Sequence, residues 1–333
     1  MATKSGRVIS AERSKDWKQI IIKWEVVLFL IFILINIFNS FISPYYMSVN
    51  GLFTATSSFL EKAFIVLPMT YLLLIGEIDI SVGSIVALSA CMMGIAYNWF
   101  GLPMWAAVIV CLLVGTLCGF INGILLIKFK DLAPMILTLG TQILFRGTAE
   151  IILTDEGTGG FTKIDWFTDL YWGTVGVVPI MFIIFVLFAI LFGIVMHKTT
   201  FGRWMYAIGS NSTAAKYSGI PVQKVRCIIY TLAGTFSAIT AVFLSSRMGS
   251  VRSNIAEGYE MEAISMVVLG GVMTYGGKGN FVGVYIAIFV IGFLRYGLGL
   301  INVPSQVMMV IIGLLLIIAV LLPNIASKMR KKH

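Results

Sequence analysis

Long apolar stretches alternate with short polar segments along most of the chain, and turn residues mark where the stretches end. Several stretches reach the roughly 17 to 25 residues that a helix needs to cross a bilayer. Ten spans are predicted, at 26–42, 63–75, 82–97, 104–127, 134–153, 177–196, 227–245, 261–275, 281–299 and 304–322. The second and eighth are short, so we expect them to extend, tilt or break. The pattern predicts an all-α, polytopic membrane protein.

Basic residues are spread unevenly over the segments between the spans. Segment 197–226 carries five Lys or Arg and no acid, whereas 154–176 carries one Lys and four acids. Because basic loops stay in the cytoplasm, the first segment is predicted inside and the second outside. Ten alternating spans then put both termini in the cytoplasm. The resulting division is a cytoplasmic tail (1–25) without a cleavable signal peptide, a transmembrane domain (26–322) and a basic cytoplasmic tail (323–333).

Composition excludes several classes of function. The chain is 59% hydrophobic and 12% charged, against roughly 25% charged residues in soluble domains. The net charge of +9 follows the span edges, so no nucleic-acid partner is expected. No catalytic constellation, cofactor site or metal site emerges. Gly277-Lys278 lacks the upstream glycine of a P-loop, because position 272 is valine, and is interpreted as a turn.

Two carboxylates, Glu77 and Asp79, interrupt the apolar sequence between the second and third spans. On a regular helix they would point roughly 200° apart, so one polar helix face is not expected. Two interpretations remain: a helix break held inside the protein, or polar residues at the cytoplasmic rim. The carboxylates would then either fix a turn or an ion pair, or act directly in gating. The candidate gate or pathway residues are Glu77, Asp79, Ser81, Asn122, Thr138 and Gln142.

The cytoplasmic segment 197–226 is longer than a simple connection, which favours a protein-docking element over a solvated linker. Within it, Ala214-Ala215 can start a short helix that Gly219 and Pro221 stop. On the outer side, charged residues of 154–176 and 246–260 form either a docking surface or a solvated loop. Arg146 and Glu150 have helical i, i+4 spacing and are expected to pair.

Three motifs, in order, resemble one known family. GEIDISVGSIVALS (76–89) resembles the signature of permease subunits from the ribose, xylose, rhamnose and autoinducer-2 group of bacterial ABC importers. FGRWMYAIGSNSTAAKYSGI (201–220) resembles the long cytoplasmic loop of that family, and YEMEAISMVVLGGVMTYGGKGNFVG (259–283) resembles its Glu-x-x-Ala-Ile pattern. The resemblance covers about residues 45–322.

The resemblance implies a function and a set of partners. The chain would import a monosaccharide or sugar-like molecule across the bacterial cytoplasmic membrane by alternating access. It would pair with a second permease subunit, identical or homologous, two ATPase subunits that hydrolyse the ATP, and an extracytoplasmic binding protein. The alternative is an ion-coupled secondary transporter that uses Glu77 and Asp79.

The resemblance also assigns contact residues. The ATPase-coupling residues would be Gly202, Arg203, Thr213, Ala214, Ala215, Lys216, Ser218, Gly219 and Ile220. The residues that dock the binding protein would be Asp165, Asp169, Arg247, Arg252 and Glu257. Two departures stand out: Thr213 replaces the usual coupling glutamate, and Glu77 replaces a usual glycine. Residues 61–103 and 262–304 share a few anchors, and the small number of them favours coincidence over the alternative, an internal repeat of the kind typical of transporters.

Overall fold

The computed structural model describes residues 24–44, 46–129, 131–154, 157–315 and 317. Most of the predicted terminal tails, and Lys130, Asp155 and Glu156 of the predicted loops, lie outside these residues. The all-α membrane fold is confirmed. Seven helices in the described part are long and apolar enough to cross a membrane, and two further apolar helices, Val82–Asn98 and Ser305–Leu315, are shorter, so the count of ten spans is not confirmed.

The helices follow the predicted order. Their bounds are α2 Trp24–Ile42, α3 Val49–Leu74, α4 Val82–Asn98, α5 Met104–Lys128, α6 Pro134–Leu153, α7 Asp165–Trp172, α8 Ile180–Lys198, α9 Thr200–Ser210, α10 Ser212–Tyr217, α11 Val222–Met248, α12 Tyr259–Leu269 and α13 Phe281–Leu300. A last helix spans Ser305–Leu315. A short 3-10 helix, η1, covers Phe161–Lys163. Two antiparallel pairs of two-residue strands join β1 (Thr158–Gly159) to β4 (Ser250–Val251) and β2 (Thr174–Val175) to β3 (Val178–Pro179).

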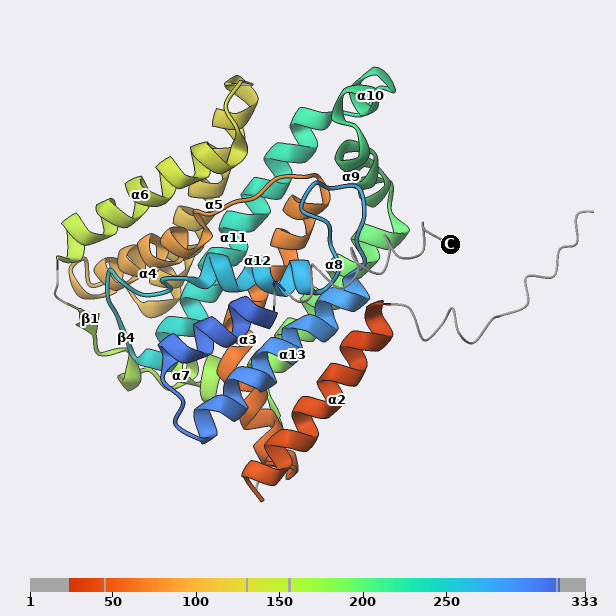
Figure 1. Ribbon diagram of the computed structural model, residues 1–333. Coiled ribbons are helices and arrows are strands. Elements are labelled where there is room, and N and C mark those ends of the chain that lie inside the picture. Colours follow the sequence, from red (N-terminus) through yellow and green to blue (C-terminus); the bar gives the residue numbers. More distant parts are fainter. Residues whose placement is uncertain (1–23, 45, 130, 155–156, 316, 318–333) are drawn as a thin grey trace, which may run out of the picture.

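Two predicted spans have different lengths in the structure. The span predicted at 63–75 is only the second half of α3, whose 26 residues start at Val49. The span predicted at 261–275 stops at Leu269, because Gly270 and Gly271 follow and Gly271 adopts φ +88°. The α9–α10 segment and the α7–strand region lie at opposite ends of the bundle, as the charge pattern predicted (Figure 1).

Helix α3 is the central element, with most of its length buried. It runs beside α11, and α11 in turn packs closely on α5 (Figure 1). Gly115, Gly119 and Gly123 line the contact face of α5, where a Cβ at Gly119 would collide with the carbonyl oxygen of Tyr230. Small residues four apart let membrane helices approach this closely, because hydrophobic burial offers no gain in lipid.

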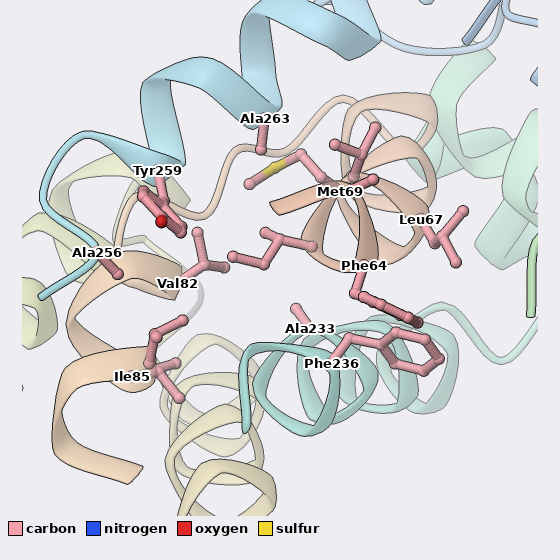
Figure 2. Close-up of a cluster of buried hydrophobic side chains, with 14 of the residues drawn as sticks. Phe64, Leu67, Met69, Val82, Ile85, Ala233, Phe236, Ala256, Tyr259 and Ala263 are labelled. Carbon is pink, nitrogen blue, oxygen red and sulfur yellow. The ribbon is translucent and has the colours of Figure 1, made fainter. Parts of the chain in front are cut away.

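An apolar layer fills the middle of the bundle between α3, α4, α11 and α12 (Figure 2). Phe64 of α3 stacks on Phe243 of α11 with ring centroids 5.0 Å apart. Leu67 and Val82 have no exposed surface. Along α3 this layer lies between Glu61 and the helix end at Leu74, so it separates two polar regions of the protein.

Two helix breaks cross at the α9 end of the bundle. Residues 75–81 separate α3 from α4, and residues 270–280 separate α12 from α13. The backbone N–H of Gly277 donates to the carbonyl oxygen of Leu74 at 2.8 Å. Gly76 and Gly276 both have positive φ and touch, which leaves no room for side chains. A helix–break–helix pattern thus occurs twice in the described residues, and Gly276-Gly277 forms the predicted turn.

Candidate transport site and coupling surface

The break at 75–81 is held by a buried network of hydrogen bonds. The backbone N–H and the hydroxyl of Ser81 donate to Oδ1 of Asp79 at 2.8 and 2.6 Å. Asn122 of α5 donates to the Ser81 hydroxyl at 2.8 Å. The backbone N–H of Ile80 donates to the Thr138 hydroxyl of α6 at 3.2 Å. Asp79 therefore fixes the turn, and its neighbours tie the break to two flanking helices.

Glu77 forms an ion pair with α11. Its Oε1 lies 2.5 Å from the Arg226 guanidinium, and the Glu77 side chain is only 5% exposed. Burying a carboxylate without a partner is costly, so Arg226 stabilises the charge of Glu77. We call the network of Glu77, Asp79, Ser81, Asn122, Thr138 and Arg226 the inner cluster.

The inner cluster brings together five of the six predicted pathway residues. The two carboxylates have the structural roles that the sequence analysis considered: Asp79 fixes a turn, and Glu77 forms an ion pair with Arg226. Gln142, the sixth, lies one turn further along α6 and is half-buried. None of the hydrogen bonds found in the described residues joins Gln142 to the break. Sequence reasoning missed Arg226 as a partner of Glu77, because the pair is distant in sequence.

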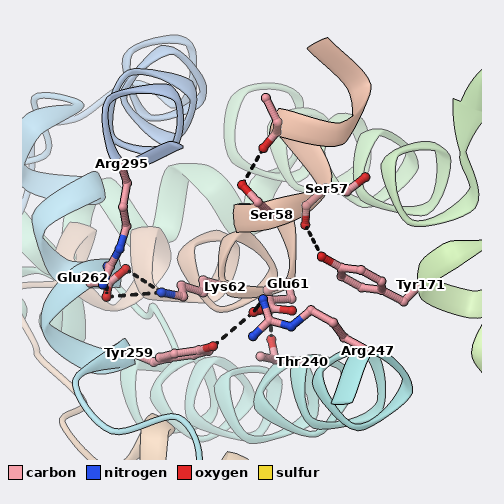
Figure 3. Close-up of polar contacts among 11 residues, drawn as sticks. Ser57, Ser58, Glu61, Lys62, Tyr171, Thr240, Arg247, Tyr259, Glu262 and Arg295 are labelled. Carbon is pink, nitrogen blue, oxygen red and sulfur yellow. Dashed lines mark hydrogen bonds and ion pairs between the residues drawn. The ribbon is translucent and has the colours of Figure 1, made fainter. Parts of the chain in front are cut away.

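A second polar network, the outer cluster, joins α3, α11, α12 and α13 (Figure 3). Glu61 of α3 is fully buried and pairs with Arg247 of α11 at 2.8 Å. The Tyr259 hydroxyl donates to the same carboxylate at 3.1 Å, and Thr240 donates to the Glu61 backbone carbonyl at 2.9 Å. Next to it, Lys62 pairs with Glu262 at 3.0 Å, and Arg295 contacts Glu262 as well.

The outer cluster changes two expectations. Arg247 was predicted to dock a soluble partner, but its guanidinium binds the buried Glu61, and its side chain is only 32% exposed. The predicted pair of Arg146 with Glu150 is wrong, because Arg146 instead donates to the carbonyl oxygens of Ser253 and Ile255 at 2.7 and 2.8 Å. The sequence analysis missed the ion pair of Lys62 with Glu262. The signal that could have indicated it is the presence of charged residues inside apolar sequence.

The other four predicted docking residues are exposed. Asp165 and Asp169 lie on α7, while Arg252 and Glu257 lie between β4 and α12. The β1–β4 pair brings the second group of residues next to the loop that leads into α7. The elements α7 and β4 lie at the end of the bundle opposite α10 (Figure 1), so these exposed charges belong to that end.

The predicted coupling residues lie mostly on the surface of α10 and its flanks. Asn211 caps α10 by accepting from the Ala214 backbone N–H at 2.9 Å. Gly219 ends the helix with φ +82°, and a Cβ added there would meet no atom within 4 Å. Ala215 is buried, which leaves the outer face to Thr213, Ala214, Lys216 and Ser218.

Three other predicted coupling residues lie on either side of α10, and they differ in exposure. Arg203 on α9 is exposed, and Ile220, just after Gly219, is half-buried. The prediction that Gly202 contacts the ATPase is corrected by its position. Gly202 is buried against the end of α8, where a Cβ would collide with the Met196 carbonyl oxygen. It therefore positions α9 and is not itself a contact surface.

Comparison with known proteins decides the family. A family model described as "Branched-chain amino acid transport system / permease component" matches residues 51–320. The chain belongs to this family of ABC-importer permeases. The "Autoinducer 2 import system permease protein LsrD" of Yersinia pestis (strain Pestoides F) is 37% identical over 304 residues, covering 89% of this chain and 90% of that protein. The same-named protein of Yersinia pseudotuberculosis serotype O:3 (strain YPIII) matches equally. No solved structure matches.

The permease assignment fixes the group, the cellular location and the general partners of the chain. It lies in the ribose and autoinducer-2 group, is a multi-pass protein of the inner membrane, and is not an enzyme, since a separate subunit hydrolyses ATP. As an importer permease it works with an ATPase and a substrate-binding partner. The assignment does not favour an ion-coupled secondary transporter, and Glu77 already has Arg226 as its counter-ion.

Proposed function

We propose that this permease imports a monosaccharide or sugar-like molecule by alternating access, in an assembly with a second permease subunit, two ATPase subunits and an extracytoplasmic binding protein. The name of its relatives makes autoinducer-2 the first candidate substrate, with ribose and rhamnose next. One observation carries the proposal: two polar clusters lie at opposite ends of α11, at Arg226 and Arg247, and the apolar layer separates them.

The mechanism assigns a role to each region. The binding protein docks on the surface around Asp165, Asp169, Arg252 and Glu257. The ATPase subunits hold the α10 surface, and their closure moves α9 and α10. Because Gly209 of α9 packs against the backbone of Leu74 and Gly277, where the two helix breaks meet, that motion is passed on to the break that carries the inner cluster. The inner and outer clusters then open in turn, as a bistable bundle requires.

Uptake in proteoliposomes tests the proposal. The permease is reconstituted alone or with its ATPase and binding-protein partners, and uptake of autoinducer-2, D-ribose and L-rhamnose is measured. We expect uptake of one probe that requires ATP, the ATPase and the binding protein together. Uptake by the permease alone, driven by a proton gradient, would overturn the proposal in favour of secondary transport.

A variant at the end of α10 tests the coupling surface. Gly219→Arg places a long cation where nothing lies close, so it should block ATPase binding without a steric clash; its φ of +82° strains the new residue, and the control carries a comparable strain. Co-purification with the ATPase measures the loss. Gly176→Arg is the matched control, because Gly176 also has positive φ and no close neighbour but lies between β2 and β3. Equal loss in both variants would show that α10 is not the docking element.

A further inference from the structure

A cavity of about 470 Å³, lined by charged and aromatic side chains, opens beside the outer cluster. Its volume falls within the range of small-molecule sites, roughly 300 to 1,000 Å³. Charged walls come from Lys62, Arg247 and Arg295, and aromatic walls from Phe59, Tyr259 and Tyr296. The cavity thus combines cationic hydrogen-bond donors with ring faces, on four different helices.

The charges around this cavity do not balance. Three cations, Lys62, Arg247 and Arg295, face two carboxylates, Glu61 and Glu262. The side chains of the cations retain between 13% and 32% exposure, whereas Glu61 has none. Each guanidinium has five N–H donors. The ion pairs therefore fix the positions of the cations and leave donors available on the open side.

A cavity with this lining is poorly suited to lipid, because a charged side chain in contact with hydrocarbon is costly. The neighbouring cavity lined by Phe32, Phe53, Phe182 and Phe289 has an apolar lining, which suits acyl chains. Arg247 lies in the last turn of α11, and the charged cavity reaches the end of α13 at Leu300. It therefore occupies the half of the bundle nearest the binding-protein surface.

We propose that this cavity is a transit site that receives a small polyhydroxylated molecule from the binding protein. Arg295 and Lys62 donate hydrogen bonds to its oxygens, and Tyr259 and Tyr296 cover its C–H faces. Gly299 leaves the α13 wall without a side chain, which provides room. The assignment rests on the proposed sugar-import function and adds to it the residues that first hold the substrate within the membrane domain.

Cysteine protection tests the transit site. Ser58 lines the cavity, and Ser57 beside it does not. Ser58→Cys and the control Ser57→Cys are made with Cys227→Ser, since the other three cysteines are buried. Labelling by a small maleimide is followed in the assembled transporter. The probe that the uptake assay transports should slow labelling of Ser58→Cys severalfold and leave Ser57→Cys unchanged.

Two outcomes of this experiment overturn the transit site. One is intact uptake with no protection of Ser58→Cys. The other is protection by glycerol phosphate instead of the transported sugar, which would identify a lipid headgroup site. Loss of uptake for every probe in the unmodified protein is different, because it contradicts the proposed function itself.

A charge-conserving variant gives an independent readout. Arg295→Lys keeps the positive charge beside Glu262 but loses the planar fork of donors. A lost hydrogen bond to a charged group corresponds to about a tenfold effect or more. We expect the amount of probe moved per ATP to fall about tenfold while ATP hydrolysis continues.

The control for this variant is Lys128→Gln, which removes an exposed charge at the end of α5, outside the cavity and both docking surfaces, and should behave like the unmodified protein. Both variants are assayed in the complete transporter, with uptake and ATP hydrolysis measured on the same vesicles. Unchanged transport per ATP in Arg295→Lys would contradict the assignment.

Discussion

The inner and outer clusters each join the α3 region to α11 through an ion pair between a glutamate and an arginine, yet the surroundings of the two pairs differ. Glu77, just beyond α3, pairs with Arg226 of α11, and Glu61 within α3 pairs with Arg247 at the other end of α11. The inner pair adjoins the buried Asp79–Ser81–Asn122 network, while the outer pair borders an open cavity. The same type of ion pair thus stabilises a backbone break at one end of α11 and, at the other end, holds N–H donors beside the cavity.

Removing either arginine should have the largest effect on stability. Arg226→Ala leaves Glu77 buried without a counter-ion, and Arg247→Ala does the same to Glu61, so each should lower the free energy of unfolding by about 3 to 5 kcal/mol. Thermal unfolding in detergent measures this. Lys224→Ala, at an exposed position of α11, is the control. Adding Glu77→Gln to Arg226→Ala should recover most of the loss; no recovery would disprove the pair.

Asn122→Ala should have an intermediate effect confined to the inner cluster. It removes the donor to the Ser81 hydroxyl inside a fully buried network, which should cost about 1 to 3 kcal/mol. The same unfolding assay applies, with the exposed Gln223→Ala as control. Protection of Ser58→Cys by the transported probe should persist in the variant. If that protection disappeared, the two clusters would not be independent sites.

Glu61→Gln should have the smallest effect. The amide keeps an acceptor for the Tyr259 hydroxyl, and the remaining Arg247 is partly exposed and can be hydrated. We expect a loss of about 1 kcal/mol or less in unfolding free energy. The informative quantity is the difference in unfolding free energy between Glu61→Gln and Arg247→Ala. Equal losses would show that the cost of leaving Glu61 buried without a counter-ion does not dominate the energetics of this pair.

Much of the fold could be predicted from the sequence because lipid imposes long apolar helices. The bounds of α6 agree with the predicted 134–153, and those of α4 and α5 differ by one residue. The first half of α3 was missed because polar residues such as Ser58, Glu61 and Lys62 resemble a loop. In the folded protein, backbone carbonyls and distant charges satisfy them.

The polar members of the inner cluster could be predicted as candidates, but the partner of each residue could be predicted only where the contact is local. Asp79 binding Ser81 two residues later is a turn that sequence reasoning can anticipate. The short helix α10 also follows from local signals, the Ala214-Ala215 pair and Gly219. By contrast, Glu61 with Arg247 and Lys62 with Glu262 join residues far apart in the chain. Only the packing of α3 against α11 and α12 brings them together.

The most direct test of alternating access measures both ends of the bundle in one experiment. Ser58→Cys reports on the outer cavity, and Ser84→Cys, buried one turn after the inner break, reports on the inner cluster. Maleimide labelling of each is compared in the assembled transporter with and without ATP, using an ATPase blocked in hydrolysis. Alternating access predicts that one site becomes more reactive as the other becomes less so. Labelling that rises at both sites together, or changes at neither, would contradict it.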